Sequence, residues 1–368
     1  MKTRYPSFLL LVIFITKITY SQDPTFSNVY QNYIYYNPGA TGIDGNWNIN
    51  LTYRTQWCGM PGSFNTYYLE VDRSICTVPG AGGIGLMAFS DTEGAGLLRK
   101  ITVGMPFSVR IKMTGNSYLF CGFYPSYNLL QIDFQKLTFS DQLNPYYGKI
   151  YPTSFTPSQN IYKRSYVDWA NFGWIYRKEI QRQGNHSERF HRKLDIGLSF
   201  FHVNHPNISI SDLDSPLPCK IVLFSNYLFP VFEKTGYYEI IMLQPGIMLE
   251  KQFTMFSYTM GCNGNFSYNE HAVILGLWYR NKSINLMKTD ALIFLAGYRK
   301  MLNRREKSCI DISFTYDLCS SSLGYETYGS SELTVRWFWG ECNLYINKKN
   351  ICDREARKLA RKKKAVHE

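Results

Sequence analysis

Aromatic residues make up 16% of this 368-residue chain, charged residues only 18%, and the formal net charge is +12. Charged residues reach about 25% in a typical soluble domain, so the composition argues against an ordinary soluble protein, although a secreted β-sandwich or β-propeller would share the bias toward strand-forming residues. No segment beyond the leader offers the roughly 20 consecutive apolar residues of a membrane helix, so we expect no helical anchor.

The N-terminus has the pattern of a signal peptide. Lys2 and Arg4 precede an apolar run over 8–15, and small residues at Thr19 and Ser21 predict cleavage before Gln22. We therefore expect residues 1–21 to be removed on export. Residues 22–44 are rich in Tyr and Asn, and we expect them to form an N-terminal segment that plugs or lines one end of the fold.

Period-two patterning recurs through the rest of the chain. In residues 47–54 (WNINLTYR) every odd position is apolar and every even position is polar. A strand places successive side chains on opposite faces, so this segment has one apolar face and one polar face. Similar runs, bounded by Gly, Pro, Asn and Asp, predict strands near 46–57, 64–75, 82–90, 99–110, 116–137, 166–177, 193–203, 219–232, 237–249, 251–262, 270–281, 290–299, 308–317 and 331–340.

Repeated segments of this kind in an exported chain favour an all-β fold, a closed antiparallel transmembrane β-barrel of about 14 strands over residues 45–345. Closure is required because an open sheet edge in hydrocarbon would leave N–H and C=O groups unsatisfied, at several kcal/mol each. The pattern predicts that Trp47, Leu51 and Tyr53 face lipid, whereas Asn50 and Arg54 face the interior.

The longest connection between predicted strands covers residues 138–165. It holds Pro145, Pro152 and Pro157 with Tyr146, Tyr147 and Tyr151, and it is far longer than a hairpin turn. Connections of this length usually have a function or lack order. We favour a surface loop over a plug for this segment.

The positive charge is concentrated at the C-terminus. Residues 348–368 carry nine Lys or Arg and three acidic residues, the leader carries three basic residues, and residues 22–347 carry about +3. We expect residues 346–368 to form a basic periplasmic tail that is either solvated or docks on an acidic periplasmic surface. Export argues against nucleic acid as a partner.

No arrangement of residues predicts catalysis or metal binding. No Ser lies in a G-x-S-x-G elbow, and the nine cysteines form no C-x-x-C and no Cys/His set with zinc spacing. His202 and His205 could approach a metal, but a polar loop is the favoured interpretation because no carboxylate or thiol ligand is close in sequence. The glycines of 80–85 predict close packing of a thin strand rather than a phosphate cradle. We expect no catalytic residue, cofactor or metal.

The odd number of cysteines leaves at least one thiol unpaired within the chain if the protein reaches an oxidising compartment. Cys121 lies in an apolar strand, where a small buried hydrophobic residue is expected. Cys342 and Cys352 flank the start of the tail and are the pair that we would most readily join.

Several stretches, in the same order along the chain, resemble the PorP/SprF family of Bacteroidota outer-membrane proteins. They include QDPTFS at 22–27, NPGATG at 37–42, YRTQW at 53–57, DTEGAG at 91–96, LTFSDQL at 137–143 and GLWYR at 276–280. The chain departs from the family pattern at Cys58, at Ser331, where the family usually has His, and in its basic tail. The family-motif positions, as structural or partner-binding candidates, are Asn37, Pro38, Tyr53, Arg54, Gln56, Trp57, Asp91, Gly94, Asp141, Gln142, His205, Pro206, Asn207, Arg280, Asp290, Tyr316, Asp317 and Glu332.

The resemblance implies a non-enzymatic outer-membrane barrel associated with type IX secretion and gliding. It implies export or surface anchoring of a large secreted adhesin-like protein through the C-terminal domain of that protein. It also implies periplasmic peptidoglycan-binding or secretion-motor proteins as partners, in addition to outer-membrane lipid. The alternative is a solute-conducting outer-membrane porin, which a wide polar lumen would favour and a lumen filled by residues 22–44 would oppose. An outer-membrane enzyme is a third reading, for which no residue set argues.

Overall fold

The computed structural model describes residues 23–339 except for gaps at 46, 61, 76–79, 95–97, 157–160, 182–190, 210–213, 235–238, 283–289, 304–307 and 321–326. The predicted signal peptide and the predicted basic tail lie outside the described residues. Among the described residues, no helix is long and apolar enough to cross a membrane.

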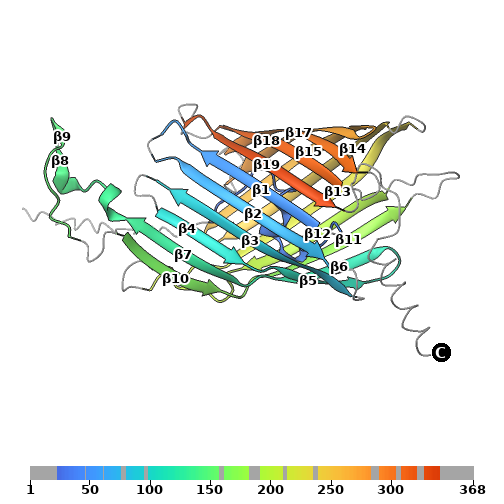
Figure 1. Ribbon diagram of the computed structural model, residues 1–368, viewed down its shortest axis with the longest axis horizontal. Helices are drawn as coiled ribbons and strands as arrows, with labels where there is room; N and C mark the ends of the chain where they lie inside the picture. Colours follow the sequence, from blue (N-terminus) through green and yellow to red (C-terminus); the bar gives the residue numbers. More distant parts are fainter. Residues whose placement is uncertain are drawn as a thin grey trace, which may run out of the picture.

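Antiparallel strands form a single closed wall, because the first strand pairs with the second and with the last (Figure 1). The wall consists of β1 (Trp47–Gln56), β2 (Phe64–Ser74), β3 (Ala81–Glu93), β4 (Leu98–Gly104), β5 (Phe107–Lys112), β6 (Ser117–Phe123), β7 (Ser126–Asp133), β10 (Ile161–Asp168), β11 (Phe172–Gln181), β12 (His191–Phe201), β13 (Lys220–Lys234), β14 (Glu239–Gln252), β15 (Met255–Tyr268), β16 (His271–Asn281), β17 (Ala291–Asn303), β18 (Ser308–Cys319) and β19 (Ser330–Trp339).

In three places, two consecutive strands form one crossing of the wall that is interrupted by a local break: β4–β5, β6–β7 and β10–β11. The seventeen named strands therefore make fourteen crossings. The predicted closed antiparallel barrel of about fourteen strands is therefore confirmed. Pro106 and Pro125 lie at two of the breaks, where a residue without an N–H cannot continue both ladders. The crossing predicted at 166–177 extends from Ile161 to Gln181, so our boundary for the preceding loop was wrong by five residues.

The two ends of the barrel are named here by their strands. The terminal end is where β1 begins and β19 finishes, and the distal end is where β1 finishes and β19 begins. At the distal end, β7 and β10 extend beyond the neighbouring strands and lead to a small hairpin of β8 (Leu143–Asn144) and β9 (Gly148–Lys149) (Figure 1). Residues 138–156 thus lie outside the wall.

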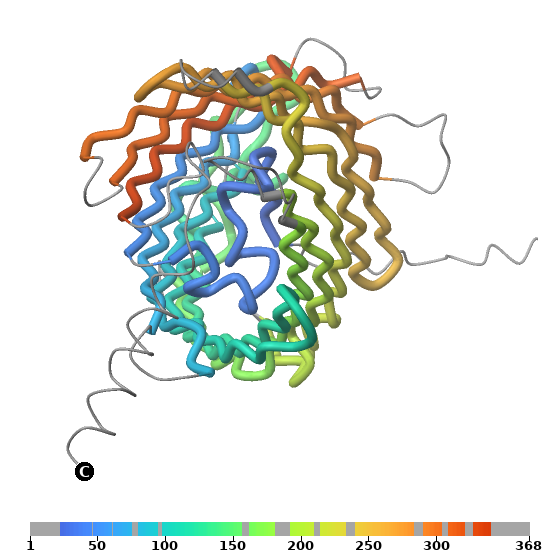
Figure 2. Tube along the Cα trace, turned by 90° about the vertical axis from the view of Figure 1, so that its right-hand side faces the viewer, coloured from blue at the N-terminus to red at the C-terminus, as the bar shows by residue number. Residues whose placement is uncertain are grey.

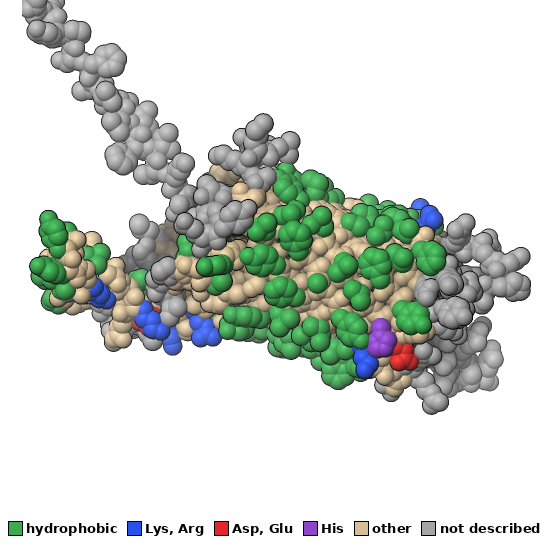
Figure 3. All heavy atoms as spheres, turned by 90° about the horizontal axis from the view of Figure 1, so that it is seen from above, with side chains coloured by type: hydrophobic (Ala, Val, Ile, Leu, Met, Phe, Trp, Pro, Cys, Tyr) green, Lys and Arg blue, Asp and Glu red, His purple; other side chains and the backbone are tan. Residues whose placement is uncertain are grey.

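Side chains alternate across the wall as the pattern predicted. Trp47, Leu51 and Tyr53 point outward with 44%, 50% and 39% of their surface exposed, whereas Asn50 and Arg54 are buried in the interior. On the face seen in Figure 3, hydrophobic side chains are spread over the wall and the charged side chains gather toward its ends. This distribution suits a wall surrounded by lipid.

Residues 23–45 lie inside the barrel (Figure 2). They include one short helical turn, α1 (Tyr33–Tyr36), and one 3-10 turn, η1 (Pro38–Ala40). Their aromatic rings pack on rings of the wall: Phe26 lies 5.2 Å from Tyr68, and Tyr33 lies 5.0 Å from Phe224, centroid to centroid. The segment therefore carries much of the apolar core.

Close backbone approach fixes this segment against β3. A Cβ at Gly83 would lie 2.6 Å from the Cα of Gly42, a separation that real Cβ atoms do not reach. Gly42 itself has a φ of +70°, which favours glycine. Close packing, rather than a phosphate cradle, thus accounts for the glycines of 80–85.

The cysteines that the structure describes differ in state. Cys58, Cys121, Cys219 and Cys262 carry free thiols, and Cys309 is disulfide-bonded. Cys121 is half-buried in β6 rather than fully buried. The pair expected between Cys342 and Cys352 lies outside the described residues.

Candidate functional site

The first charged cluster in the lumen is centred on Arg54 near the distal end. Arg54 Nη2 lies 3.1 Å from Asp317 Oδ2, and Arg54 Nη1 lies 3.4 Å from Glu332 Oε2. Arg280 Nη2 reaches the same Asp317 oxygen at 2.8 Å, and its Nε donates to Asp290 at 2.8 Å. These five residues, from β1, β16, β18, β19 and the residue before β17, are called the Arg54 network.

The Arg54 network holds the N-terminal segment. The Glu332 carboxylate accepts the N–H groups of Ser27 at 2.7 Å and Asn28 at 3.2 Å, and the side-chain amide of Asn32 at 3.1 Å. The Ser27 hydroxyl donates to Asp317 at 2.7 Å. Glu332 is only 1% exposed, so its oxygens need partners within the protein. Arg54 and the N-terminal segment supply them.

A second cluster surrounds His202, which follows β12. The imidazole Nδ1 lies 2.6 Å from Asp168 Oδ2, and Nε2 lies 2.6 Å from Asp23 Oδ2. Lys100 Nζ contacts the other Asp23 oxygen at 2.8 Å. Burial alone lowers the pKa of His202, but Asp23 and Asp168 more than offset it and raise that pKa above its ordinary value. A charged imidazole can donate to both carboxylates, so His202 fastens the start of the segment to the wall.

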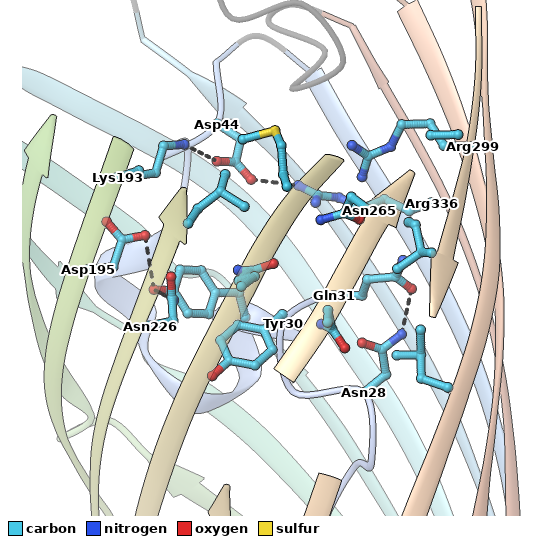
Figure 4. Close-up of a pocket in the computed structure, with 18 of the residues that line it drawn as sticks. Asn28, Tyr30, Gln31, Asp44, Lys193, Asp195, Asn226, Asn265, Arg299 and Arg336 are labelled. Carbon is cyan, nitrogen blue, oxygen red and sulfur yellow. Dashed lines mark hydrogen bonds and ion pairs between the residues drawn. The ribbon is translucent and has the colours of Figure 1, made fainter. Parts of the chain in front are cut away.

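A third cluster lies at the terminal end and holds the last residues of the segment. The Asp44 carboxylate contacts Arg336 at 2.9 Å, Arg177 at 3.6 Å and Lys193 at 4.0 Å. Arg177 also forms two parallel bonds to Asp195, at 2.7 and 2.8 Å. Figure 4 shows Asp44 between Lys193 and Arg336. The segment is thus fastened at both ends.

A cavity of about 110 Å³ lies between the N-terminal segment and strands from β11 to β19. Its polar lining includes Tyr30 and Asn28 from the segment and Asn226, Asn265 and Arg299 from the wall (Figure 4). Small-molecule sites usually enclose roughly 300–1,000 Å³, so this cavity is too small for most solutes. Among the described residues, no group of His, Cys, Asp and Glu is arranged to hold a metal.

Five of the motif positions meet inside the barrel, and two more lie on the N-terminal segment. Arg54, Arg280, Asp290, Asp317 and Glu332 form the Arg54 network, and Asn37 lies deeper on the segment. The Asn37 side chain accepts the N–H of Gly39 at 2.8 Å and donates to the carbonyls of Trp174 and Leu198, both at 3.1 Å. Pro38 then begins η1. The sequence motifs at these positions therefore encode the attachment of the segment to the wall.

Other motif positions lie on the wall or its distal rim. Tyr53 faces outward, and Tyr316, whose hydroxyl donates to the Tyr328 carbonyl at 3.2 Å, lies on the same side of β18 as exposed Phe314. Gln56 ends β1, and Trp57 follows it with a φ of 57°. Asp91 is buried and accepts the Thr66 hydroxyl at 2.6 Å, and Gly94 turns the chain after β3 with a φ of +68°.

The remaining motif positions belong to two distal loops. Asp141 and Gln142 lie in the extension beyond β7. His205, Pro206 and Asn207 lie between β12 and β13, where His205 Nδ1 is 3.1 Å from the Leu217 carbonyl and the Asn207 amide donates to Asp214 at 2.6 Å. These residues shape loops, and His205 does not join His202 at a common ligand.

Sequence reasoning missed the roles of His202, Asp23 and Asp44. Asp23 and Asp44 stand at the two ends of the predicted N-terminal segment, which could have marked them as attachment points. The signal for His202 was weaker, because its partners lie 34 and 179 residues away.

Comparison with known proteins decides the family. A family model described as type IX secretion system membrane protein PorP/SprF matches residues 18–337. The chain belongs to the PorP/SprF family. This PorP/SprF protein is an outer-membrane β-barrel, as the closed wall and the family together require. The family is described as a secretion membrane protein, not as an enzyme.

Solved structures are similar to this PorP/SprF protein only at low identity and with TM-scores below 0.5. A Pseudomonas aeruginosa FadL homologue has 10% identity and a TM-score of 0.44 over 82% of this chain and 91% of that one. The CymD monoaromatic hydrocarbon channel has 10% identity and a TM-score of 0.43 over 84% and 92%. Omp33 of Acinetobacter baumannii has 7% identity and a TM-score of 0.36 over 81% and 98%. No curated protein matches the chain.

Proposed function

We propose that this PorP/SprF protein supports export or surface anchoring of a large secreted adhesin-like protein by binding the C-terminal domain of that protein. In this role the barrel is a sealed docking platform in the outer membrane and not a solute channel. Family membership supports the link to type IX secretion. The proposal extends that link to a cargo, to gliding and to a non-enzymatic mode of action.

The observation that carries the proposal is the occupied lumen. The N-terminal segment is fastened by Glu332 and His202 near the distal end and by Arg336 near the terminal end. Charges that line an ion pathway need to exchange with mobile ions, whereas these charges are buried and matched within the protein. A cavity of about 110 Å³ lies beside the segment.

The two ends of the barrel would then face different partners. We assign the terminal end to the periplasm, because single-chain barrels of even strand number begin and end on that side. The basic residues 346–368 would follow β19 on the same side, where a peptidoglycan-binding or secretion-motor protein could contact them. The distal end, with its long loops, would face the cell exterior and the cargo.

Deletion of the gene in its native bacterium tests this proposal. Surface biotinylation with mass spectrometry should show the loss of one large surface protein, and the wild-type gene should restore it. Purified protein in a planar bilayer should show no steady conductance. Normal display of every large surface protein in the deletion strain, together with reduced solute uptake, would overturn the proposal and favour the porin alternative.

A further inference from the structure

The extension at the distal end contains a strand with one open edge. β10 pairs with β7 from Ile161↔Asp133 to Asp168↔Ser126, without a register shift. On its other side, β12 ends at Phe201 and pairs only with β11 and β13. In Figure 1, β10 extends past the strands that would otherwise flank it. Within the described part of the chain, no strand covers the outer edge of β10.

The direction of the backbone groups on this edge follows from one contact. The Asn204 side-chain amide, on the β12 side, donates to the Val167 carbonyl at 3.2 Å, so Val167 presents its backbone to the open edge. Because N–H and C=O of one residue in an antiparallel strand point to the same side, Lys163 and Ser165 present theirs there too. No described residue forms a backbone hydrogen bond with these groups of Lys163 and Ser165.

Natural edge strands are usually protected against pairing by proline, a bulge or a very short length. The eight residues of β10 contain no proline, and their register has no bulge. The six residues before Val167 could pair with a partner strand over about 20 Å. The charged residues of β10 that could protect its edge are Lys163 and Arg164. Two basic side chains restrict the charge of a partner more than they prevent pairing.

A second feature of the same extension also points to a partner. The β8–β9 hairpin exposes Tyr146 by 90% and Tyr147 by 79%, with Ile150 and Tyr151 about half exposed beside them. In Figure 3 a hydrophobic group stands apart from the barrel at the end where Figure 1 places this hairpin. Clusters of exposed aromatic side chains away from lipid are typical of protein-binding surfaces.

The hairpin is held in one shape without any partner. The Asp141 carboxylate accepts the Ser154 N–H at 2.6 Å and the Thr153 hydroxyl at 3.0 Å, and the side-chain Oδ1 of Asn144 accepts the Tyr146 N–H at 2.9 Å. Asp141 thus joins the start of the extension to residues 153 and 154. A surface that is already ordered loses less conformational entropy on binding.

We infer that the β10 edge and the β8–β9 hairpin together form a docking surface for an extended segment of a partner polypeptide. The segment would add a strand to β10, and its apolar side chains would contact the tyrosines. Lys149 and Lys163 are exposed around this surface, and Lys136 pairs with Asp133 at 3.9 Å. Among the described residues 134–156, the exposed acid Asp141 is engaged by Thr153 and Ser154. This charge favours an acidic segment. The identity of the partner as secreted cargo rests on the proposed function.

The test uses a photo-crosslinking amino acid at position 163 of the full-length protein in living cells, with position 84 on the lipid-facing wall as the control. We expect an adduct with a secreted protein from position 163 only, mapped by mass spectrometry to one extended acidic segment. Ser165→Pro removes an edge donor and blocks strand addition but spares the bonds to β7, because the N–H of Ser165 points away from β7. It should reduce the adduct at least tenfold, whereas Ser165→Ala should leave it unchanged.

Heat-modifiable mobility shows whether each variant barrel is folded. The inference is wrong if a folded wild-type barrel gives no adduct, if Ser165→Pro leaves the adduct intact, or if the adduct is a second copy of the barrel. The deletion strain separates this result from the proposed function. An adduct sensitive to Ser165→Pro, with normal display of that protein after deletion, would retain the docking surface and reject the cargo role. The opposite outcome is lost display after deletion, with normal display in the Ser165→Pro strain and no adduct from position 163. It would retain the cargo role and reject the docking surface.

Discussion

Asp317 Oδ2 lies 3.1 Å from Arg54 Nη2 in the barrel interior, where both side chains are at most 3% exposed. The same oxygen accepts a hydrogen bond from Arg280 at 2.8 Å and one from the Ser27 hydroxyl at 2.7 Å. One carboxylate therefore compensates two arginines and holds the N-terminal segment. Without this charge, and among the described acids, Arg54 keeps only Glu332, at 3.4 Å, and Arg280 keeps only Asp290, at 2.8 Å.

Asp317→Asn should strongly destabilise the folded barrel. The substitution keeps the size of the side chain but removes the charge that Arg54 and Arg280 share. Because Glu332 and Asp290 still pair with the two arginines, the cost is that of weakened charge-assisted hydrogen bonds, about 1.5–3 kcal/mol each. The measurement is the denaturant midpoint of the purified protein in detergent. Asp290→Asn is the control, because Asp290 is 19% exposed and contacts Arg280 alone within the network. Equal midpoints for the two variants would contradict the central role of Asp317.

The contribution of His202 to stability should fall as pH rises. Its pKa is raised in the folded protein, so the stabilisation is fully present below the unfolded pKa of about 6.5 and is lost as pH rises through the folded pKa. The pKa of Asp23 is lowered well below its usual range despite burial, because Lys100 and His202 lie beside it. Asp23 therefore stays charged across the whole of this interval.

The comparison of wild type with His202→Gln isolates this contribution. Gln cannot donate through two opposite ring nitrogens, so one carboxylate loses its donor at every pH. We expect the difference in apparent Tm to be largest at pH 6 and to shrink toward pH 9. A difference that is constant across this range would show that the imidazolium does not fasten Asp23.

Displacement of the N-terminal segment should open the lumen. Gly83→Val places side-chain carbons where the Cα of Gly42 now lies, so the segment must move away from β3. We expect the variant to conduct ions in a planar bilayer and the wild type to remain closed. Ile84→Val, on the lipid-facing side of the same strand, should behave as wild type. A closed Gly83→Val barrel with a normal fold would mean that the lumen is sealed by other residues.

The alternation of residues 47–54 was sufficient to predict the wall, because each face of a lipid-surrounded strand has only one favourable polarity. It placed Arg54 and Asn50 inside correctly. The breaks at Pro106 and Pro125 were not predicted, since a proline at a break leaves the alternation on either side unchanged. Strand boundaries in the extension were also missed, because residues 161–165 extend beyond their neighbours and need not alternate as a lipid-facing strand must.

The lumenal contacts were less accessible to sequence reasoning. Glu332 binds Ser27 across 305 positions, and His202 binds Asp23 across 179. Contacts at such separations depend on barrel closure and on the path of the N-terminal segment. The family resemblance did mark Arg54, Asp317 and Glu332, but it could not show that they meet at one place or what they hold.

An arginine on the outward face of β1 should impair assembly of the barrel more than an arginine in the terminal half of the lumen. Leu51 is 50% exposed on the lipid side, so Leu51→Arg should cost about 2–4 kcal/mol if the residue lies near the bilayer midplane. Asn50 is an unsuitable control, because it is fully buried and donates to Asn32 at 2.9 Å. Asn265 lines the cavity of about 110 Å³, so Asn265→Arg places the same side chain in a polar space. The fraction of heat-modifiable barrel recovered from outer membranes should be low for Leu51→Arg and near wild type for Asn265→Arg. The reverse order would show that the two faces have been exchanged.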